Sequence, residues 1–261
     1  MSNPINELKL YFGDDYEINQ YITVHNPTVG DVIEMGETEY FTALHTLIAI
    51  PSDMKSILWD MGICWMDISD YDLFIMIAPT LTLEQSRIFF GDLDFTKFIP
   101  VTNQENNEPV LLQFAPDHLP IVIDNGIYLR IVKILRTIHN ITPKVEYAMN
   151  KTTRNILIEL DRQERLKRQN MDEISTLQPL ISAMVNSEGF KYDLQGLRKM
   201  PYYAFLDSIQ RISLIKNASA LLQGCYGGWV DGSKIDKENL NWMKQFKIEN
   251  NNIQQTKQGT K

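Results

Sequence analysis

The segment from Pro27 to Leu81 decides the fold: PTVGDVIEMGETEYFTALHTLIAIPSDMKSILWDMGICWMDISDYDLFIMIAPTL. Thr28, Ser52 and Ser69 are N-cap residue types, and each precedes apolar residues at helical spacing. The sequence therefore predicts three successive helices, which begin at these three residues.

Each of the three helices has its own stop signal. Pro51 ends the first, Gly62 takes the C′ position of the second, and Pro79 stops the third. Thr82, with Gln85 three residues later, opens a further short helix. The segment contains no recognisable catalytic motif.

Two regions lack the helical period and predict small β components. Residues 8–25 alternate apolar and polar side chains around the turn residues 13–15, as a β-hairpin or two short strands would. Residues 95–124 contain short, partly β-branched apolar runs bounded by Pro, Asn and Asp, with residues 103–108 as a hairpin tip or exposed loop. We expect two or three strands there, packed on helices.

The C-terminal half is helical in pattern. Residues 127–138 carry isoleucine and leucine on one face and charged side chains on the other, which predicts a strongly amphipathic helix. A second helix follows from about Lys151, with Ile156, Leu157 and Leu160 expected to point inward.

Two further helices and a glycine-rich stretch follow. Pro179 suits the first turn of a helix that runs to Gly189. Residues 201–223 form a long helix whose second half is apolar or small on nearly every side, so we expect other elements to enclose it. The glycines of residues 224–232 (GCYGGWVDG) should break this helix, and a last short helix over residues 238–246 should pack on the body through four side chains: Leu240, Trp242, Met243 and Phe246.

The predicted fold class is mainly α with a small β component (α+β). The chain has 261 residues, of which 44% are hydrophobic and 22% charged, an ordinary globular balance. We expect one globular domain over residues 1–246, with a subdivision into an α+β part (1–124) and a helical part (125–246) left open. Residues 247–261 are polar, bury too little surface to offset their ordering entropy, and are expected to form a disordered tail.

Composition argues against several classes of partner. The net charge of −8 and the pI of about 5.1 do not favour nucleic acid, whose binding depends on neutralising phosphates. The apolar runs fall far short of the roughly 20 residues that a membrane helix needs. Cys64 and Cys225 are the only cysteines, which fits a reducing cytosol, and the N-terminus lacks the features of a secretory signal.

Candidate ligand residues are scattered. None of the histidines (His25, His45, His118 and His139) has a neighbour at metal-ligand spacing, although a site assembled by tertiary contact stays open. Asp92 and Asp94 are either a carboxylate pair or, as we favour, two solvated acids in a turn. We assign no catalytic, cofactor-binding or metal-binding residue and expect no cofactor.

Two motif-like segments have structural interpretations. Residues 161–168 (DRQERLKR) place Asp161 four residues before Arg165 and Glu164 four before Arg168, the pairing of a solvated helix face rather than a nucleic-acid patch. The glycines of residues 224–232 follow a helix, whereas phosphate-binding glycine loops lead into one. We therefore interpret them as a helix stop and a sharp turn.

Four segments resemble tail-region proteins of phages and prophages of Gram-positive bacteria. They cover residues 11–41 (YFGDDYEINQYITVHNPTVGDVIEMGETEYF), 50–81 (IPSDMKSILWDMGICWMDISDYDLFIMIAPTL), 87–95 (RIFFGDLDF) and 221–244 (LLQGCYGGWVDGSKIDKENLNWMK). The resemblance carries over no functional residue, because these motifs set the fold rather than a chemistry.

The resemblance implies a tail assembly chaperone in the host cytoplasm. Such a protein would keep the helical tape-measure protein soluble and help recruit tail-tube subunits; self-association stays open. A minor structural protein of the virion tail is the alternative, and an enzyme using Asp92 and Asp94 is a remote third. We expect no enzymatic activity, no nucleic acid partner and no membrane partner.

Overall fold

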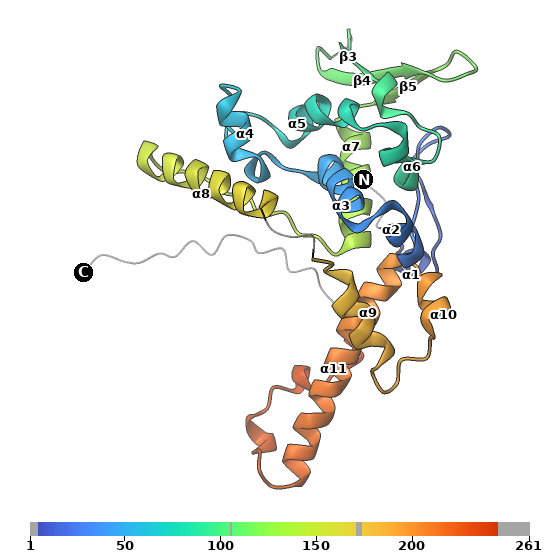
Figure 1. Ribbon diagram of the computed structural model, residues 1–261, viewed down its shortest axis with the longest axis vertical. Coiled ribbons are helices and arrows are strands. Elements are labelled where there is room, and N and C mark those ends of the chain that lie inside the picture. The colour runs from blue at the N-terminus through green and yellow to red at the C-terminus, as the bar shows by residue number, and fades with distance from the viewer. Residues whose placement is uncertain (1–4, 105, 171–173, 245–261) are drawn as a thin grey trace.

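The computed structural model describes residues 5–104, 106–170 and 174–244, and this part of the chain is mainly helical with two small sheets, as predicted (Figure 1). The helices are α1 (Glu7–Tyr11), α2 (Val29–Met35), α3 (Glu37–Ile48), α4 (Lys55–Asp60), α5 (Asp70–Ile77), α6 (Leu83–Phe90), α7 (Asn125–His139), α8 (Lys151–Gln169), α9 (Leu177–Val185), α10 (Leu194–Arg198) and α11 (Tyr202–Tyr226). The strands are β1 (Tyr16–Glu17), β2 (Thr23–Val24), β3 (Ile99–Thr102), β4 (Pro109–Phe114) and β5 (Pro120–Ile123).

The N-terminal segment is only partly the predicted hairpin. Strands β1 and β2 pair antiparallel, but residues 7–11 form helix α1, whose first amides are capped by the side chain of Asn6. Leu10 is buried while Leu8 and Phe12 are exposed. Alternation over five residues cannot separate a strand from a short helix, because Leu8 and Phe12 are also one helical turn apart.

The N-terminal capping signals are mostly confirmed. Thr28, Ser69 and Thr82 each cap a helix and form a reciprocal capping box with the residue three positions later. Ser52 is an exception, because it lies in a 3₁₀ turn and α4 begins only at Lys55.

Two glycines with positive φ punctuate this region. The predicted helix from Thr28 to Pro51 is divided into α2 and α3 at Gly36, whose φ of +92° is costly for any residue with a side chain. Gly62, with φ of +78°, follows the end of α4 as predicted.

The predicted central strand region forms three strands, which make one antiparallel sheet in the order β3–β4–β5. Residues 103–108 connect β3 to β4, and the Asn103 amide donates to the Glu108 carbonyl at 2.9 Å, which confirms the hairpin. Leu111, Ile121 and Ile123 lie on one face of this sheet and belong to the main apolar core.

Helix α7 lies at the centre of the main core, and its predicted amphipathic face is confirmed. Four of its apolar side chains are at most 1% exposed: Ile131, Ile134, Leu135 and Ile138. The helix packs against α3, α11, β2 and β5, so it joins both sheets to the C-terminal helices.

A second, smaller apolar cluster joins α4 to α8 and contains Leu58, Trp65 and Ile158. The prediction that Ile156 and Leu160 point inward is wrong, because these side chains are 54% and 51% exposed. Helix α8 packs mainly on α4, so it buries a narrower face than its apolar residues would allow.

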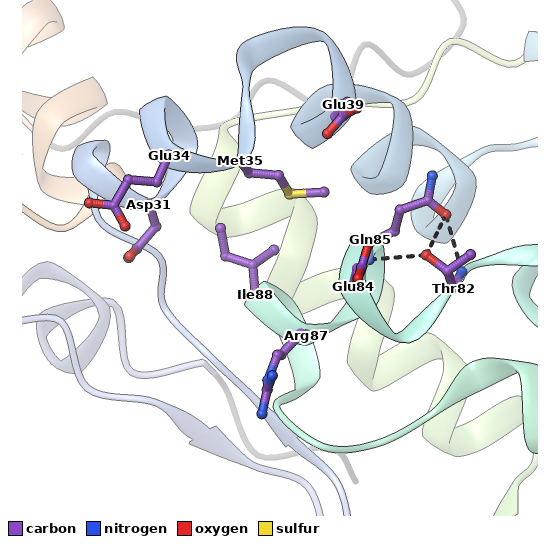
Figure 2. A pocket seen from close by; sticks show the side chains of 9 residues that line it. All are labelled: Asp31, Glu34, Met35, Glu39, Thr82, Glu84, Gln85, Arg87 and Ile88. Atoms are coloured by element: carbon purple, nitrogen blue, oxygen red, sulfur yellow. Dashed lines mark hydrogen bonds between the residues drawn. The ribbon is translucent and has the colours of Figure 1, made fainter.

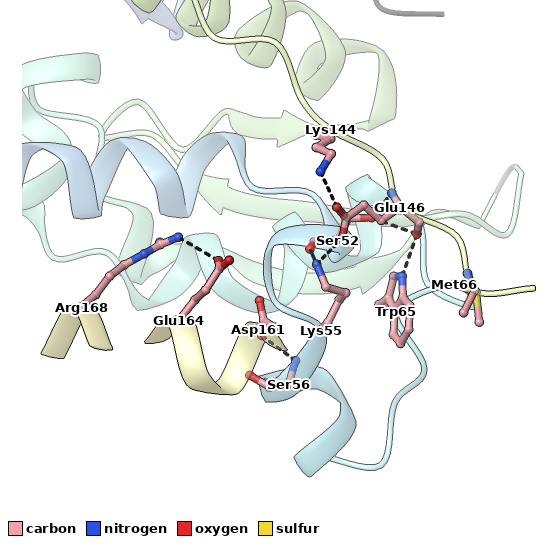
Figure 3. Close-up of polar contacts among 11 residues, drawn as sticks. Ser52, Lys55, Ser56, Trp65, Met66, Lys144, Glu146, Asp161, Glu164 and Arg168 are labelled. Atoms are coloured by element: carbon pink, nitrogen blue, oxygen red, sulfur yellow. Dashed lines mark hydrogen bonds and ion pairs between the residues drawn. The ribbon is translucent and has the colours of Figure 1, made fainter. Parts of the chain in front are cut away.

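Polar contacts fix the segment between α7 and α8 beside this cluster (Figure 3). Lys55 and Lys144 both donate to the carboxylate of Glu146, at 2.9 and 2.7 Å, and Trp65 donates its indole N–H to the Glu146 carbonyl. The hydrogen bonds from the two lysines, that from Lys144 first, hold the pKa of the Glu146 carboxylate below its ordinary value.

The start of α9 is tied to the body by one carboxylate. Glu37 of α3 accepts hydrogen bonds from the hydroxyls of Ser175 and Thr176 and from the amides of Thr176 and Leu177. It thus supplies the N-terminal cap of α9, a helix that contains Pro179 in its first turn as predicted.

The predicted enclosure of the second half of α11 is wrong. Its first half packs into the main core through Tyr202 and Phe205, but the rest projects from the body (Figure 1). Ile215 and Leu222 are 40% and 37% exposed.

The end of α11 and the segment after it also differ from the prediction. The helix continues through Gly224 to Tyr226. The last predicted helix is only a 3₁₀ turn (Lys237–Asn239), and Trp242 and Met243 are exposed. Residues 245 and 246 of that helix, including Phe246, and the tail of residues 247–261 lie outside the described residues.

Among the described residues, none of the helices combines the length and the apolar character that crossing a bilayer requires.

Candidate functional site

The most distinctive surface is the part that projects from the body, residues 213–244, which we call the arm. It consists of the distal half of α11 and the segment that returns alongside it (Figure 1). The return segment contains two 3₁₀ turns, each capped by an aspartate side chain: Asp231 caps Gly232–Lys234, and Asp236 caps Lys237–Asn239.

Large apolar side chains lie exposed over both halves of the arm. Tyr226 and Trp229 at its tip are 87% and 91% exposed. Five more exposed apolar residues follow along the helix and the return segment: Ile215, Leu222, Val230, Trp242 and Met243. Because monomeric proteins rarely leave grouped aromatic side chains in water, this surface is the candidate functional site.

The tip is a tight turn that only glycine allows. A Cβ atom on Gly224 would lie 2.8 Å from the Cγ2 of Val230, and the Gly224 carbonyl accepts from the amides of Trp229 and Val230. Gly228 has a φ of +73°. The predicted turn in residues 224–232 is confirmed, although the helix ends at Tyr226 and not at Gly224.

The return segment is tied to α11 near the base of the arm. Arg211 donates to the carbonyls of Trp242 and Lys244, at 2.6 and 2.9 Å, and pairs with Asp207 one turn earlier at 3.7 Å. These contacts hold Trp242 beside the helix, so the arm presents its two apolar halves in a fixed relation.

The charge of the arm differs from that of the chain as a whole. Its charged residues are four lysines (Lys216, Lys234, Lys237, Lys244) and three acids (Asp231, Asp236, Glu238), whereas the whole chain has a net charge of −8. A partner of this surface would therefore be recognised through apolar side chains and not through a strong charge of either sign.

A separate concave surface, with a volume of about 590 Å³, lies between α2, α3 and α6 and is acidic (Figure 2). Asp31 and Glu34 are already engaged, because Asp31 accepts from Thr28 in the capping box of α2 and Glu34 pairs with Arg198. Glu39 and Glu84 complete the four carboxylates. These four acids come from three helices that are distant in sequence or separated by a turn, so no sequence motif could reveal the pocket.

Asp92 and Asp94 each have a local structural role. Asp92 pairs with Arg87 at 2.9 Å, and Asp94 caps a 3₁₀ turn by accepting from the amide and hydroxyl of Thr96. The hydrogen bond from the Thr96 hydroxyl is the main cause that holds the pKa of Asp94 below its ordinary value. This geometry fits two acids of a turn.

The four histidines lie in four different surroundings. His25 contacts Asp15 at 2.7 Å, His45 lines a surface beside α3, and His118 occupies a turn with φ of +65°. His139 is buried in the main core. In the described ranges, no group of three or more His, Cys, Asp and Glu side chains has an arrangement that could hold a metal ion.

The charge run of residues 161–168 is a solvated helix face only in part. Glu164 and Arg168 form the expected pair at 3.6 Å. Asp161 and Arg165 instead contact α4. The Asp161 carboxylate accepts from the Ser56 amide (Figure 3), and Arg165 donates to the Ser56 hydroxyl. Half of the run therefore joins two helices.

The sequence pattern did not reveal the exposed apolar surface of the arm. Residues 224–232 predicted a turn, and the apolar residues of α11 predicted burial. The available signal was the presence of Tyr226 and Trp229 inside a glycine-rich turn, where a large aromatic side chain has little backbone around it to pack on.

Comparison with known protein families gives a match to the C-terminal part of the chain. Residues 167–247 match the family model of the YomV second domain, and YomV is a protein encoded by Bacillus phages and prophages. The matched region contains α9, α10, α11 and the whole arm. No curated protein and no solved structure matches the chain. The match suggests that the chain is a phage-associated protein.

Proposed function

We propose that this chain is a phage tail assembly protein of the chaperone type, which binds a helical tail protein reversibly through the arm. Its clients would be the tape-measure protein, the tail-tube protein or both. The resemblance of four segments to phage tail-region proteins and the match to the YomV second domain support a phage role. The observation that carries the binding role is the exposure of Tyr226 and Trp229 at the tip of the arm.

The chemistry of the arm suits an amphipathic helix as the client. Tryptophan and tyrosine are enriched among the residues that dominate binding energy, because they bury a large area at a small entropic cost. A client helix would place its apolar stripe against the exposed apolar side chains of α11 and the return segment. Binding should then have a negative heat-capacity change, because apolar surface leaves water.

Co-expression with the tape-measure protein of the same phage tests the proposal. The wild-type chain should keep the client soluble and co-elute with it in gel filtration. Replacing both Tyr226 and Trp229 by alanine should remove most of the complex, since two anchors are lost. The matched control is Tyr147→Ala, which removes an aromatic side chain that is 66% exposed but lies outside the arm.

The proposal fails if the client is equally insoluble with and without the chain and no complex survives gel filtration. A minor structural role in the tail is the alternative. Mass spectrometry of purified particles separates the two, because an assembly chaperone should be absent from the mature tail and a structural protein should be present.

A further inference from the structure

Residues 231–244 of the return segment have little apolar packing to hold them on α11. None of their side chains is buried; Ile235, Leu240 and Lys244 are half-buried, and the others are exposed. The 3₁₀ turn Lys237–Asn239 packs on α11, but its residues are charged or polar. Because burial of apolar surface is the main force that holds one element on another, a different interaction must place this segment.

Hydrogen bonds from one side chain supply that placement. The backbone hydrogen bonds within residues 231–244 are local and join residues at most three positions apart. Among the described residues, the hydrogen bonds that join this segment to α11 come from Arg211. At the other end, the Gly224 carbonyl accepts from the amides of Trp229 and Val230. The return segment is therefore fastened at the tip of the arm and at Arg211.

The guanidinium of Arg211 contacts three acceptors. Its Nη1 donates to the carbonyls of Trp242 and Lys244, at 2.6 and 2.9 Å. Its Nη2 lies 3.7 Å from the carboxylate of Asp207, one helical turn earlier. The side chains of Arg211 and Asp207 are only 28% and 23% exposed, so these charge-assisted contacts are stronger than contacts in open solvent.

We propose that Arg211 is the positioning residue of the arm, which fixes the end of the return segment on α11 and so holds Trp242 in the client-binding surface. This inference rests on the proposed function and names the side chain on which the geometry of that surface depends. Arg211 acts through Trp242 and not through a contact of its own with the client.

Trp242 depends on this support because the chain around it has no other anchor. Its side chain is 46% exposed, and its neighbours Asn241 and Met243 are exposed as well. A side chain that is already ordered does not lose that freedom again when a partner binds. Without Arg211, residues 241–244 are free to leave α11, and binding must order them. The affinity for the client should then fall by about tenfold.

The choice of arginine at this position follows from the number of acceptors. A planar guanidinium carries five donors and reaches two carbonyls and a carboxylate together, whereas the compact ammonium of lysine has three donors at a single nitrogen. Arg211→Lys should therefore keep part of the support, and Arg211→Gln, which removes the charge, should lose nearly all of it.

Hydrogen–deuterium exchange of the full chain alone tests the support without any client. In Arg211→Gln, the amides of residues 240–244 should exchange more than about tenfold faster than in the wild type, because the charge-assisted bonds no longer oppose local opening. Arg211→Lys should give an intermediate rate. The matched control is Arg198→Gln, which removes an arginine that pairs with Glu34 outside the arm, and it should leave these amides unchanged.

A double-mutant cycle tests whether Arg211 acts through Trp242. The probe is a synthetic helical segment of the tape-measure protein, and its affinity is measured by titration calorimetry. Arg211→Gln and Trp242→Ala should each weaken binding by about tenfold, and the double variant should match Trp242→Ala to within about twofold. A role of Arg211 in the fold alone would instead weaken binding by the same factor in both backgrounds.

Three results overturn the assignment of Arg211: unchanged exchange of residues 240–244 in Arg211→Gln, equal affinity of Arg211→Gln and the wild type for the probe, or full additivity in the double variant. A wild-type chain that binds no segment of the tape-measure protein overturns the proposed function instead. The exchange experiment then still decides whether Arg211 fixes the return segment, so the two failures are distinguishable.

Discussion

His139 is the residue whose environment most constrains the chain's behaviour in acid. Its Nδ1–H donates to the Leu135 carbonyl at 2.7 Å, and its Nε2 accepts from the hydroxyl of Tyr40 at 2.5 Å. Burial, partly offset by the hydrogen bond to Leu135, lowers the pKa of His139 to about 4. The folded protein therefore keeps this ring neutral at a pH where the unfolded chain protonates it.

The first prediction follows from this difference. Because the folded-state pKa of His139 is below the unfolded value of about 6.5, its contribution to stability is present above pH 6.5 and is lost as the pH falls toward 4, by up to about 3 kcal/mol. Denaturant melts between these pH values should show the loss in the wild type and a smaller one in His139→Gln. The exposed His118→Gln should behave as the wild type, and an unchanged slope in His139→Gln would contradict the assignment.

A second prediction at the residue scale concerns Glu37. Replacing it by alanine leaves the first turn of α9 without its cap and removes several charge-assisted hydrogen bonds, which should cost about 1–3 kcal/mol. Glu39→Ala, on the same helix, should change the free energy of unfolding by less than about 0.5 kcal/mol. Equal losses in urea melts would show that Glu37 does not tie α9 to the body.

Sequence could not assign these roles, because both depend on contacts between distant parts of the chain. His139 is one of four histidines of similar local context, and its partner Tyr40 lies 99 residues earlier. Glu37 accepts from residues about 140 positions later. Asp161 and Arg165 have the spacing of a local ion pair, but both side chains form hydrogen bonds with Ser56 of α4 instead.

At the scale of elements, α7 is a buried helix, whereas the second half of α11 projects from the body. Leu135 in α7 is fully buried, so Leu135→Ala should cost about 2–5 kcal/mol through lost contacts and the cavity left behind. Leu222 on the arm is 37% exposed, and Leu222→Ala should cost less than about 1 kcal/mol. Urea melts of the two variants measure this difference, and a loss above 2 kcal/mol for Leu222→Ala would mean that the arm is enclosed in solution.

The elements that sequence predicted well are those with local signals. The capping boxes at Thr28, Ser69 and Thr82 and the glycine after α4 depend on neighbours within a few residues, and the structure confirms each of them. The exposed apolar residues of α8 and α11 were predicted to be buried, and both predictions were wrong for the same reason. An apolar pattern shows that a surface avoids water, but it does not say whether the covering partner belongs to the same chain.

At the scale of the whole molecule, the arm and the β3–β4–β5 sheet lie at opposite ends of the long axis (Figure 1). The arm carries exposed aromatic side chains, and Ile99 and Phe114 are exposed on the sheet.

Hydrogen–deuterium exchange of the chain with and without the tape-measure protein tests the central claim, that the arm is the client-binding surface, most directly. The account predicts that protection on binding is concentrated in residues 213–244 and disappears when Tyr226 and Trp229 are both replaced by alanine. Protection confined to the body, or none at a client concentration at which the two proteins co-elute, would contradict it.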